Sequence, residues 1–202
     1  MTFVLGLTGS MGMGKSTTAD LFRARGIPVY DADQTVHRLY EGRLARLIED
    51  AFPGTVHDGR VDRSRLAGFV LHDEAAMRRL EAIVHPEVQK EQDAFLNTCR
   101  MSDIPLAVLD IPLLYEKGKD KSCDAVLVVS APANIQRARL LSRPDMTPEK
   151  LDGLLARQMD DQEKRRRADF VIDTSVSIAD ADRQLTELLA SLAKRNFPHG
   201  SL

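Results

Sequence analysis

The sequence predicts an α/β fold, a five-stranded parallel sheet flanked by helices. A glycine-rich loop stands between a short apolar run and a helical pattern, which is the order of a strand, a turn and a helix. Further short apolar runs recur along the chain, and helical patterns separate them, as crossovers between parallel strands require. The five expected strands are residues 3–7, 28–30, 104–109, 125–130 and 170–173.

The glycine-rich loop, Gly9-Ser10-Met11-Gly12-Met13-Gly14-Lys15-Ser16, fits the pattern G-x-x-x-x-G-K-[ST] with no mismatch. Glycines let the backbone curl until its N–H groups converge on one anion, and the following helix adds its partly positive N-terminus. Lys15 would reach the β- and γ-phosphates, and the Ser16 hydroxyl would suit Mg²⁺. A turn with an incidental lysine is the alternative, but the flanking patterns favour a nucleotide site. Its expected contacts are Gly9, Gly12, Met13, Gly14, Lys15, Ser16 and Thr17.

Two carboxylates, Asp31 and Asp33, follow the second predicted strand. Residues two apart in an extended chain point the same way, and ligands of open α/β sheets bind beyond the carboxyl ends of the strands. Both residues are therefore candidates for the reacting centre. Aspartate is equally common in turns and helix caps, so the pattern leaves that interpretation open.

Residues 34 to about 103 show helical periodicity and no further strand. This length far exceeds a simple crossover, which indicates an inserted helical region that binds the substrate. His85-Pro86 is expected to interrupt it, because the residue before proline is pushed from helical geometry. His85 is a candidate ligand contact, although a lone histidine is usually a packed or surface residue.

Asp110 closes the apolar run 104–109, the position of the acid that holds magnesium through water in many P-loop enzymes. A cap on the following turn is the alternative. A basic helix with Arg137, Arg139 and Arg143 then ends near Pro144, and a second helix runs from Thr147 to the basic cluster 164–167. The two helices resemble a lid that closes over nucleotide.

Within this lid, Arg139 and Arg143 are four residues apart and are expected to share a helix face. They are preferred as phosphate contacts over the cluster 164–167, which suits a helix C-terminus. An amphipathic helix closes the chain, and residues 198–202 are expected to be disordered.

Composition argues against several classes of protein. The formal net charge of -2 gives no support for nucleic-acid binding, and no stretch approaches the roughly 18 apolar residues of a membrane span. Cys99 and Cys123 lack the spacing of a zinc site or a disulfide framework, which fits a reducing compartment. The apolar N-terminus has no preceding basic region, so we expect no signal peptide. We expect a cytoplasmic protein with no nucleic-acid or membrane partner.

Together these segments resemble the dephospho-CoA kinase family over residues 3–175. The resemblance is carried by Gly6-Leu7-Thr8-Gly9 through Ser16, Asp31-Ala32-Asp33 with Arg38, Asp58-Gly59 with Asp62-Arg63, Leu80-Glu81 with His85-Pro86, Asp110-Ile111-Pro112-Leu113-Leu114, the series Gln136, Arg139, Arg143, and Ala168-Asp169-Phe170-Val171-Ile172-Asp173. That family transfers the γ-phosphoryl group of ATP to the ribose 3′-hydroxyl of dephospho-CoA, the last step of coenzyme A synthesis. The resemblance implies ATP and Mg²⁺ as cofactors. It also implies a P-loop kinase core over 1–34, 104–136 and 168–202, a dephospho-CoA-binding region over 35–103, and a lid over 137–167.

The resemblance also implies roles for single residues. It selects Asp33 to accept the hydroxyl proton, and positioning outweighs basicity because the hydroxyl loses its proton late in a loose transition state. Lys15, Arg139 and Arg143 are expected to act on the transferring group. The acceptor is expected to contact Thr8, Asp31, Arg38, His85, Asp110, Leu114 and Tyr115.

Four positions depart from the family's usual residues. Ser10 and Met13 replace a frequent glycine and a frequent serine at variable loop positions. Thr174 stands where asparagine is common, which bears on the adenine contact. Tyr115 replaces a common phenylalanine and keeps an aromatic ring for the acceptor's adenine.

Two other functions stay open at this point. One is a kinase of the same fold that acts on a nucleoside monophosphate or a sugar acid. The other is a regulatory nucleotide switch of the GTPase type, although the Asn/Thr-Lys-x-Asp guanine reader of such proteins is absent, and Lys121-Ser122-Cys123-Asp124 has the wrong spacing. The sequence leaves the oligomeric state open and is compatible with a monomer.

Overall fold

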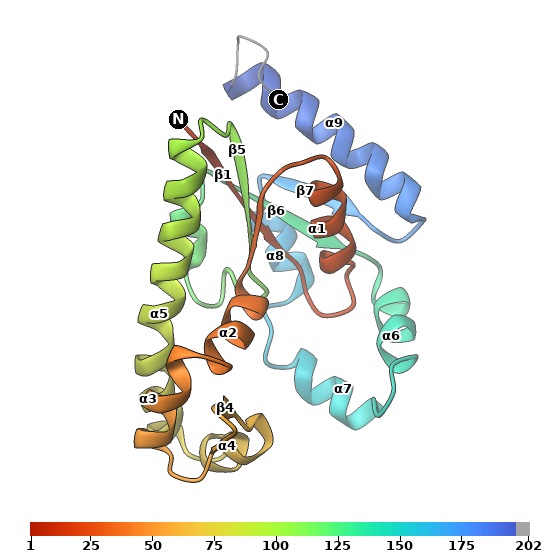
Figure 1. Cartoon of the computed structure of the whole chain (residues 1–202). Helices are drawn as coiled ribbons and strands as arrows, with labels where there is room; N and C mark the ends of the chain where they lie inside the picture. Colours follow the sequence, from red (N-terminus) through yellow and green to blue (C-terminus); the bar gives the residue numbers. More distant parts are fainter. Residues whose placement is uncertain (197–202) are drawn as a thin grey trace. The chain divides into compact units, whose positions relative to one another are not determined.

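The computed structural model describes residues 1–196 and contains the predicted five-stranded parallel sheet, in the order β2-β5-β1-β6-β7. Figure 1 labels β1, β5, β6 and β7 of this sheet. β1 (Phe3–Thr8) pairs with β5 (Leu106–Asp110) on one side and with β6 (Ala125–Ser130) on the other. β7 (Phe170–Asp173) extends the sheet beyond β6, and β2 (Val29–Asp31) forms the opposite edge. The carboxyl ends of β1 and β5 therefore meet at the edge where ligands bind in such sheets. The expected disorder of the last residues of the chain lies outside the described residues.

Helices cover the sheet. α1 (Lys15–Ala24) packs against β1 and against the closing helix α9 (Ile178–Asn196), which also contacts β7. α8 (Asp161–Arg167) packs against β6. Val4 and Leu5, which point to opposite faces of β1, are both buried. A strand buried on both faces carries a continuous apolar run, which is why the strand segments show no alternation in the sequence.

The chain forms two compact units, residues 31–97 and the remainder of the described chain, which holds the sheet. The helical unit has its own apolar cluster, which includes Leu44, Ile48 and Phe52. Its elements are α2 (Ala32–Tyr40), α3 (Arg43–Ala51), β3 (Val56–His57), β4 (Arg60–Val61), α4 (Arg63–Val70) and α5 (Glu74–Met101), whose last residues belong to the sheet unit. The unit covers most of the predicted acceptor region, whereas the predicted lid lies within the sheet unit; the predicted division stays a prediction.

The hairpin of β3 and β4 corrects the expectation that the helical region holds no further strand. Its strands pair antiparallel and have two residues each, which is too short for an alternating pattern to appear. Asp58 and Gly59 form the turn with positive φ angles of 49° and 74°. The sequence showed the turn residues but not the strands that flank them.

The predicted interruption at His85-Pro86 is wrong, because α5 runs through Pro86 as one helix. A proline inside a helix removes one backbone hydrogen bond and costs about 3 kcal/mol. Leu80 and Val84 before the proline and Val88 after it pack on the same apolar cluster. Burial on both sides of the proline offsets this cost and keeps the helix continuous.

The helix expected from Thr147 to the basic cluster is two helices, α7 (Pro148–Leu155) and α8. Asp160 is the N-cap of α8, because its carboxylate accepts the N–H groups of Gln162 and Glu163. Just before it, the Met159 N–H donates to Glu116 Oε1 at 2.8 Å. This bond to a distant segment uses a backbone donor that a continuous helix would need. None of the helices within residues 1–196 is long and apolar enough to span a membrane.

Candidate nucleotide and acceptor sites

The phosphate loop connects β1 to α1, as its pattern predicts. Gly12 and Gly14 have positive φ angles of 79° and 86°, a region that other residues rarely adopt. Gly9 is needed for a different reason, because a Cβ there would lie 2.7 Å from the Val129 carbonyl oxygen. α1 begins at Lys15, and the first N–H groups of a helix have no acceptor within it. The loop and the helix N-terminus thus offer backbone donors to an anion.

Lys15 and Asp110 meet at the edge of the sheet. Their Nζ and Oδ1 atoms are 2.5 Å apart, and Asp110 is only 2% exposed. The parallel register of β1 and β5 places Leu7 beside Asp110, which brings the strand-end acid to the loop that follows β1. The sequence predicted each residue separately, and the structure brings them together as an ion pair.

Ser16 and Thr17 are exposed in the first turn of α1. An exposed hydroxyl at a helix N-terminus fits Mg²⁺, which prefers oxygen ligands and keeps several waters when it is bound with phosphates. Within the described part of the chain, no group of three His, Cys, Asp or Glu side chains is placed to hold a metal.

Three candidate acceptor contacts, Thr8, Leu114 and Tyr115, are buried in the sheet unit. The Thr8 hydroxyl donates to the Pro112 carbonyl oxygen at 3.0 Å, which ties the end of β1 to the segment after β5. Burial, and next the negative charge of Asp169, raise the pKa of Tyr115 to about 12, so this phenol stays protonated. In this structure these side chains shape the sheet edge from within the core.

Asp31 and Asp33 lie in the helical unit at the start of α2, in different surroundings. Asp31 is the N-cap of α2, because its Oδ1 accepts the Gln34 N–H at 2.9 Å. Asp33 lies in the first turn and is exposed, where the helix dipole favours a negative charge. The helix-cap interpretation therefore holds for Asp31, while Asp33 keeps its carboxylate at the surface.

Arg38, further along α2, lines a pocket of about 270 Å³ within the helical unit. Arg43 and Glu91 line the same pocket, and the Arg43 Nη2 and Glu91 Oε1 atoms are 2.6 Å apart. Arg38 Nη2 lies 3.9 Å from Glu91 Oε2 and is mostly exposed. The pocket therefore presents an accessible guanidinium that can bind an anionic group. His85 is exposed on α5 and is not among the residues that line the pocket.

Arg139, in α6 (Ala133–Leu141), connects the phosphate loop to the end of β7. Its Nη1 donates to the Gly12 carbonyl oxygen at 3.3 Å, and its Nη2 donates to the Thr174 carbonyl oxygen at 2.6 Å. The Thr174 hydroxyl donates to the Met13 carbonyl oxygen at 2.9 Å. Both side chains thus hold the backbone of the loop in this structure.

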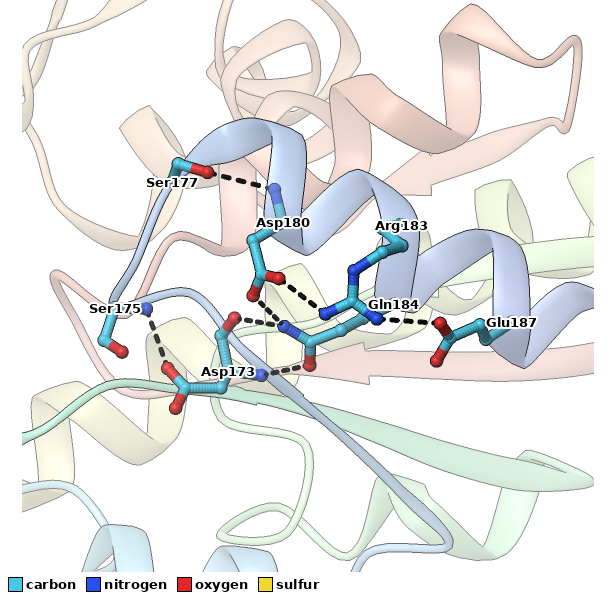
Figure 2. Close-up of polar contacts among 7 residues, drawn as sticks. All are labelled: Asp173, Ser175, Ser177, Asp180, Arg183, Gln184 and Glu187. Atoms are coloured by element: carbon cyan, nitrogen blue, oxygen red, sulfur yellow. Dashed lines mark hydrogen bonds and ion pairs between the residues drawn. The ribbon is translucent and has the colours of Figure 1, made fainter.

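The end of β7 is itself fixed by α9. Gln184 accepts the Asp173 N–H and donates to the Asp173 carbonyl oxygen, so one carboxamide pairs with both backbone groups of this edge residue (Figure 2). Asp180 also accepts a hydrogen bond from Gln184 and is ion-paired with Arg183. This network sets the backbone that presents Thr174 to the loop.

The sequence profile of the family described as Dephospho-CoA kinase matches residues 3–180 of this chain. The chain belongs to the dephospho-CoA kinase family. A relative named "Dephospho-CoA kinase" from Rhodopseudomonas palustris strain BisB18 is 58% identical over 191 residues, which are 95% of this chain and 96% of the relative.

Solved structures agree with the fold of this kinase. The crystal structure of TT1252 from Thermus thermophilus superposes with a TM-score of 0.81 at 37% identity and covers 95% of this chain and 98% of that chain. The shikimate kinase from Acinetobacter baumannii in complex with shikimate has a TM-score of 0.53 at 18% identity, with 96% of both chains covered. At that identity the likeness concerns the fold alone, which is the α/β fold of P-loop kinases.

Lys164 is a buried residue of this kinase that the sequence did not reveal. It belongs to the basic run 164–167 but is 0% exposed, and its Nζ lies 2.9 Å from Glu116 Oε1. Burial alone would raise the pKa of Glu116, but the Met159 N–H and Lys164 outweigh this effect and lower it. The residues of the basic run do not indicate which of them is buried. The packing of α8 against β6 places Lys164 inside and leaves its arginine neighbours more exposed.

Arg143 corrects the expectation that it shares a helix face with Arg139. α6 ends at Leu141, and Arg143 is exposed in the connection that follows. Its backbone N–H donates to the Leu140 carbonyl oxygen at 3.1 Å, which is the tightened geometry of a helix end. By contrast, the prediction that the basic run suits a helix C-terminus is confirmed, because it occupies the last turn of α8.

Proposed function

We propose that this kinase transfers the γ-phosphoryl group of ATP to the ribose 3′-hydroxyl of dephospho-CoA, with Asp33 as the group that accepts the hydroxyl proton. As a member of its family, the protein is an enzyme that phosphorylates dephospho-CoA in coenzyme A biosynthesis. The observation that carries the proposal is the family match over residues 3–180, together with a phosphate loop whose glycines have the required geometry.

On the donor side, the loop N–H groups and Lys15 are proposed to bind the β- and γ-phosphates. The binding of phosphate gives the Lys15 ammonium a second anionic partner beside Asp110. Ser16 is the residue that would hold Mg²⁺ together with phosphate oxygens and waters. The metal, when bound, neutralises charge on the transferring group.

On the acceptor side, Asp33 is proposed to orient the attacking hydroxyl and to take its proton late in the reaction. Arg38 and the pocket that it lines are proposed to bind an anionic part of dephospho-CoA. His85 and the buried Thr8, Leu114 and Tyr115 are proposed as further acceptor contacts. Asp31 acts as a cap that sets the direction of α2 and hence of Asp33.

Arg139 and Arg143 of the lid are proposed to have different roles. Arg139 already holds the loop and the end of β7, and it would act on phosphate from that position. Arg143 is exposed in the connection after α6 and is proposed to reach the transferring group when the lid closes. One chain supplies all these residues, so we propose that a monomer is sufficient for activity.

We propose a cytoplasmic enzyme with no nucleic-acid or membrane partner.

An acceptor panel tests the proposal. The purified protein with ATP and Mg²⁺ should release ADP when dephospho-CoA is present and should yield coenzyme A, detected by mass. Adenosine, AMP, shikimate and gluconate serve as alternative acceptors, and GTP as an alternative donor. Equal turnover with another acceptor would point to the related small-molecule kinase instead, and slow hydrolysis of GTP without any acceptor would point to a regulatory switch.

A further inference from the structure

Two glutamines hold the backbone of the phosphate loop at Met11. Gln136 Nε2 donates to the Met11 carbonyl oxygen at 2.8 Å, and the Met11 N–H donates to Gln158 Oε1 at 3.0 Å. Gln136 lies on α6, one residue before the predicted lid (137–167), whereas Gln158 follows α7 and lies within that lid. Both backbone groups of one loop residue are thus held by two side chains, one from just before the lid and one from within it.

These contacts add to those that Arg139 and Thr174 make with Gly12 and Met13, and a cavity lies beside the loop. Ser10 and Met13, on either side of Met11, line a cavity of about 670 Å³. Gln136 and Gln158 line the same cavity, and Gln136 is only 7% exposed. On its other side the loop is packed, because a Cβ at Gly12 would lie 2.8 Å from Leu140 Cγ, whereas the side toward the cavity has no such packing. On that side, hydrogen bonds to Met11 restrict the backbone.

The hydrogen bond of Gln136 also sets the direction of a donor that is expected to bind phosphate. The Met11 carbonyl and the Gly12 N–H belong to one trans peptide group and point in opposite directions. Arg139 holds the next carbonyl, that of Gly12, and Thr174 holds that of Met13. Because Gln136 and Thr174 bond the Met11 and Met13 carbonyls, the N–H groups of Gly12 and Gly14 in the same peptide groups point away from these side chains. These two N–H groups are the donors that we propose to bind phosphate.

We propose that Gln136 and Gln158 are positioning residues that couple the lid and the helix leading into it to the phosphate loop, so that the loop takes its anion-binding shape only when both side chains are bonded to Met11. This role rests on the proposed function, in which the loop binds the phosphates of ATP. The two residues act through the backbone of Met11 and need not touch the nucleotide. Weaker nucleotide binding, rather than weaker acceptor binding, is the expected result of breaking either contact.

The two contacts have opposite polarity, which makes one substitution diagnostic. Gln136 must donate, so Gln136→Glu sets a carboxylate oxygen against the Met11 carbonyl. Gln158 must accept, so Gln158→Glu keeps its hydrogen bond, whereas Gln158→Leu removes it. Gln162→Glu is the matched control for charge, because Gln162 lines the same cavity and is exposed at the start of α8.

The test measures ADP binding to the full chain by calorimetry with Mg²⁺, without acceptor, alongside KM values for ATP and dephospho-CoA and the midpoint of denaturation. We expect Gln136→Glu and Gln158→Leu to weaken ADP binding by about tenfold and to raise the KM for ATP in parallel. Gln158→Glu should weaken it no more than Gln162→Glu does. The KM for dephospho-CoA should change by less than about twofold in all four variants.

Two results would overturn the coupling. The first is equal ADP affinity in Gln136→Glu and Gln162→Glu. The loss of affinity would then come from the added negative charge and not from the broken hydrogen bond. The other is a lower denaturation midpoint with unchanged nucleotide affinity, which would make the glutamines merely structural. ADP binding needs no acceptor, so failure of the wild-type protein to phosphorylate dephospho-CoA would refute the proposed function and still leave the glutamines to be decided by calorimetry.

Discussion

The sheet unit and the helical unit expose their candidate residues to very different degrees. In the sheet unit, Asp110 is buried against Lys15, and Arg139 is bonded to the loop backbone. In the helical unit, Asp33 and Arg38 lie at the surface of α2, while the apolar cluster beneath is built from other residues. Lys15 and Arg139, which are assigned to phosphate, are thus bonded into the framework, whereas the acceptor candidates Asp33 and Arg38 lie on its surface.

This difference means that substitutions in the sheet unit should change stability and catalysis together, whereas substitutions at the surface of the helical unit should change catalysis alone. A buried polar residue that loses its partner destabilises the fold, whereas an exposed carboxylate can be changed with little effect on unfolding. The substitutions below test this contrast, and each compares a residue with a neighbour in matched surroundings.

Asp33→Asn should have the largest effect on catalysis. We expect kcat to fall by about 10² to 10⁴-fold, because the amide cannot accept the hydroxyl proton. The free energy of unfolding should change by less than about 0.5 kcal/mol, since Asp33 is exposed. Asp31→Asn is the control, and its effect should be milder because asparagine caps a helix as well as aspartate. Steady-state kinetics and urea denaturation measure both, and the reverse ranking of the two variants would show that the wrong carboxylate was chosen.

Lys164→Met should have the largest effect on stability. Removing the ammonium leaves the largely buried Glu116 carboxylate with the Met159 N–H but without its cationic partner, which costs about 3 kcal/mol of unfolding free energy. Arg165→Met, at an exposed position of the same helix, should cost less than about 0.5 kcal/mol. Chemical denaturation at neutral pH measures the free energy of unfolding of both variants. Equal stability of the two variants would mean that the buried pair contributes nothing beyond a surface charge.

Arg143→Ala should lower kcat by about tenfold or more and change the KM for dephospho-CoA little, because the charge matters most in the transition state. Arg137→Ala provides a control from the same basic segment, since Arg137 is ion-paired with Asp152 at the surface. The kinetic constants of both variants should be measured at saturating ATP. A normal kcat in Arg143→Ala would make this arginine a solvated surface charge.

Pro86→Ala should have the smallest effect, and it should be stabilising. The alanine restores one helical hydrogen bond in α5, and the greater entropy of the unfolded chain offsets part of that gain. We expect a net gain of about 1–2 kcal/mol. Thermal and urea denaturation would detect it, and a loss of stability would show that the proline is needed for the path of α5.

The amino-acid sequence alone predicted the features whose causes are local. Neighbouring residues were enough to predict the turn of the phosphate loop and the buried strands, and to give a helix cap as one interpretation of Asp31-Ala32-Asp33. Turn geometry and strand burial depend on short-range sterics and hydrophobicity. The resemblance to dephospho-CoA kinases was also carried by such segments. It is confirmed by the family match.

Only the tertiary structure decided the features whose causes lie far away in the chain. The burial of Lys164 depends on its ion pair with Glu116, and the break between α7 and α8 depends on the hydrogen bond from the Met159 N–H to Glu116. The backbone of Met11 is held by Gln136 and Gln158, which are far from it in the chain. The continuity of α5 through Pro86 likewise depends on an apolar cluster assembled from several helices. Hydrogen bonds and packing between distant segments have no signature in local pattern, since each partner alone looks like an ordinary surface residue.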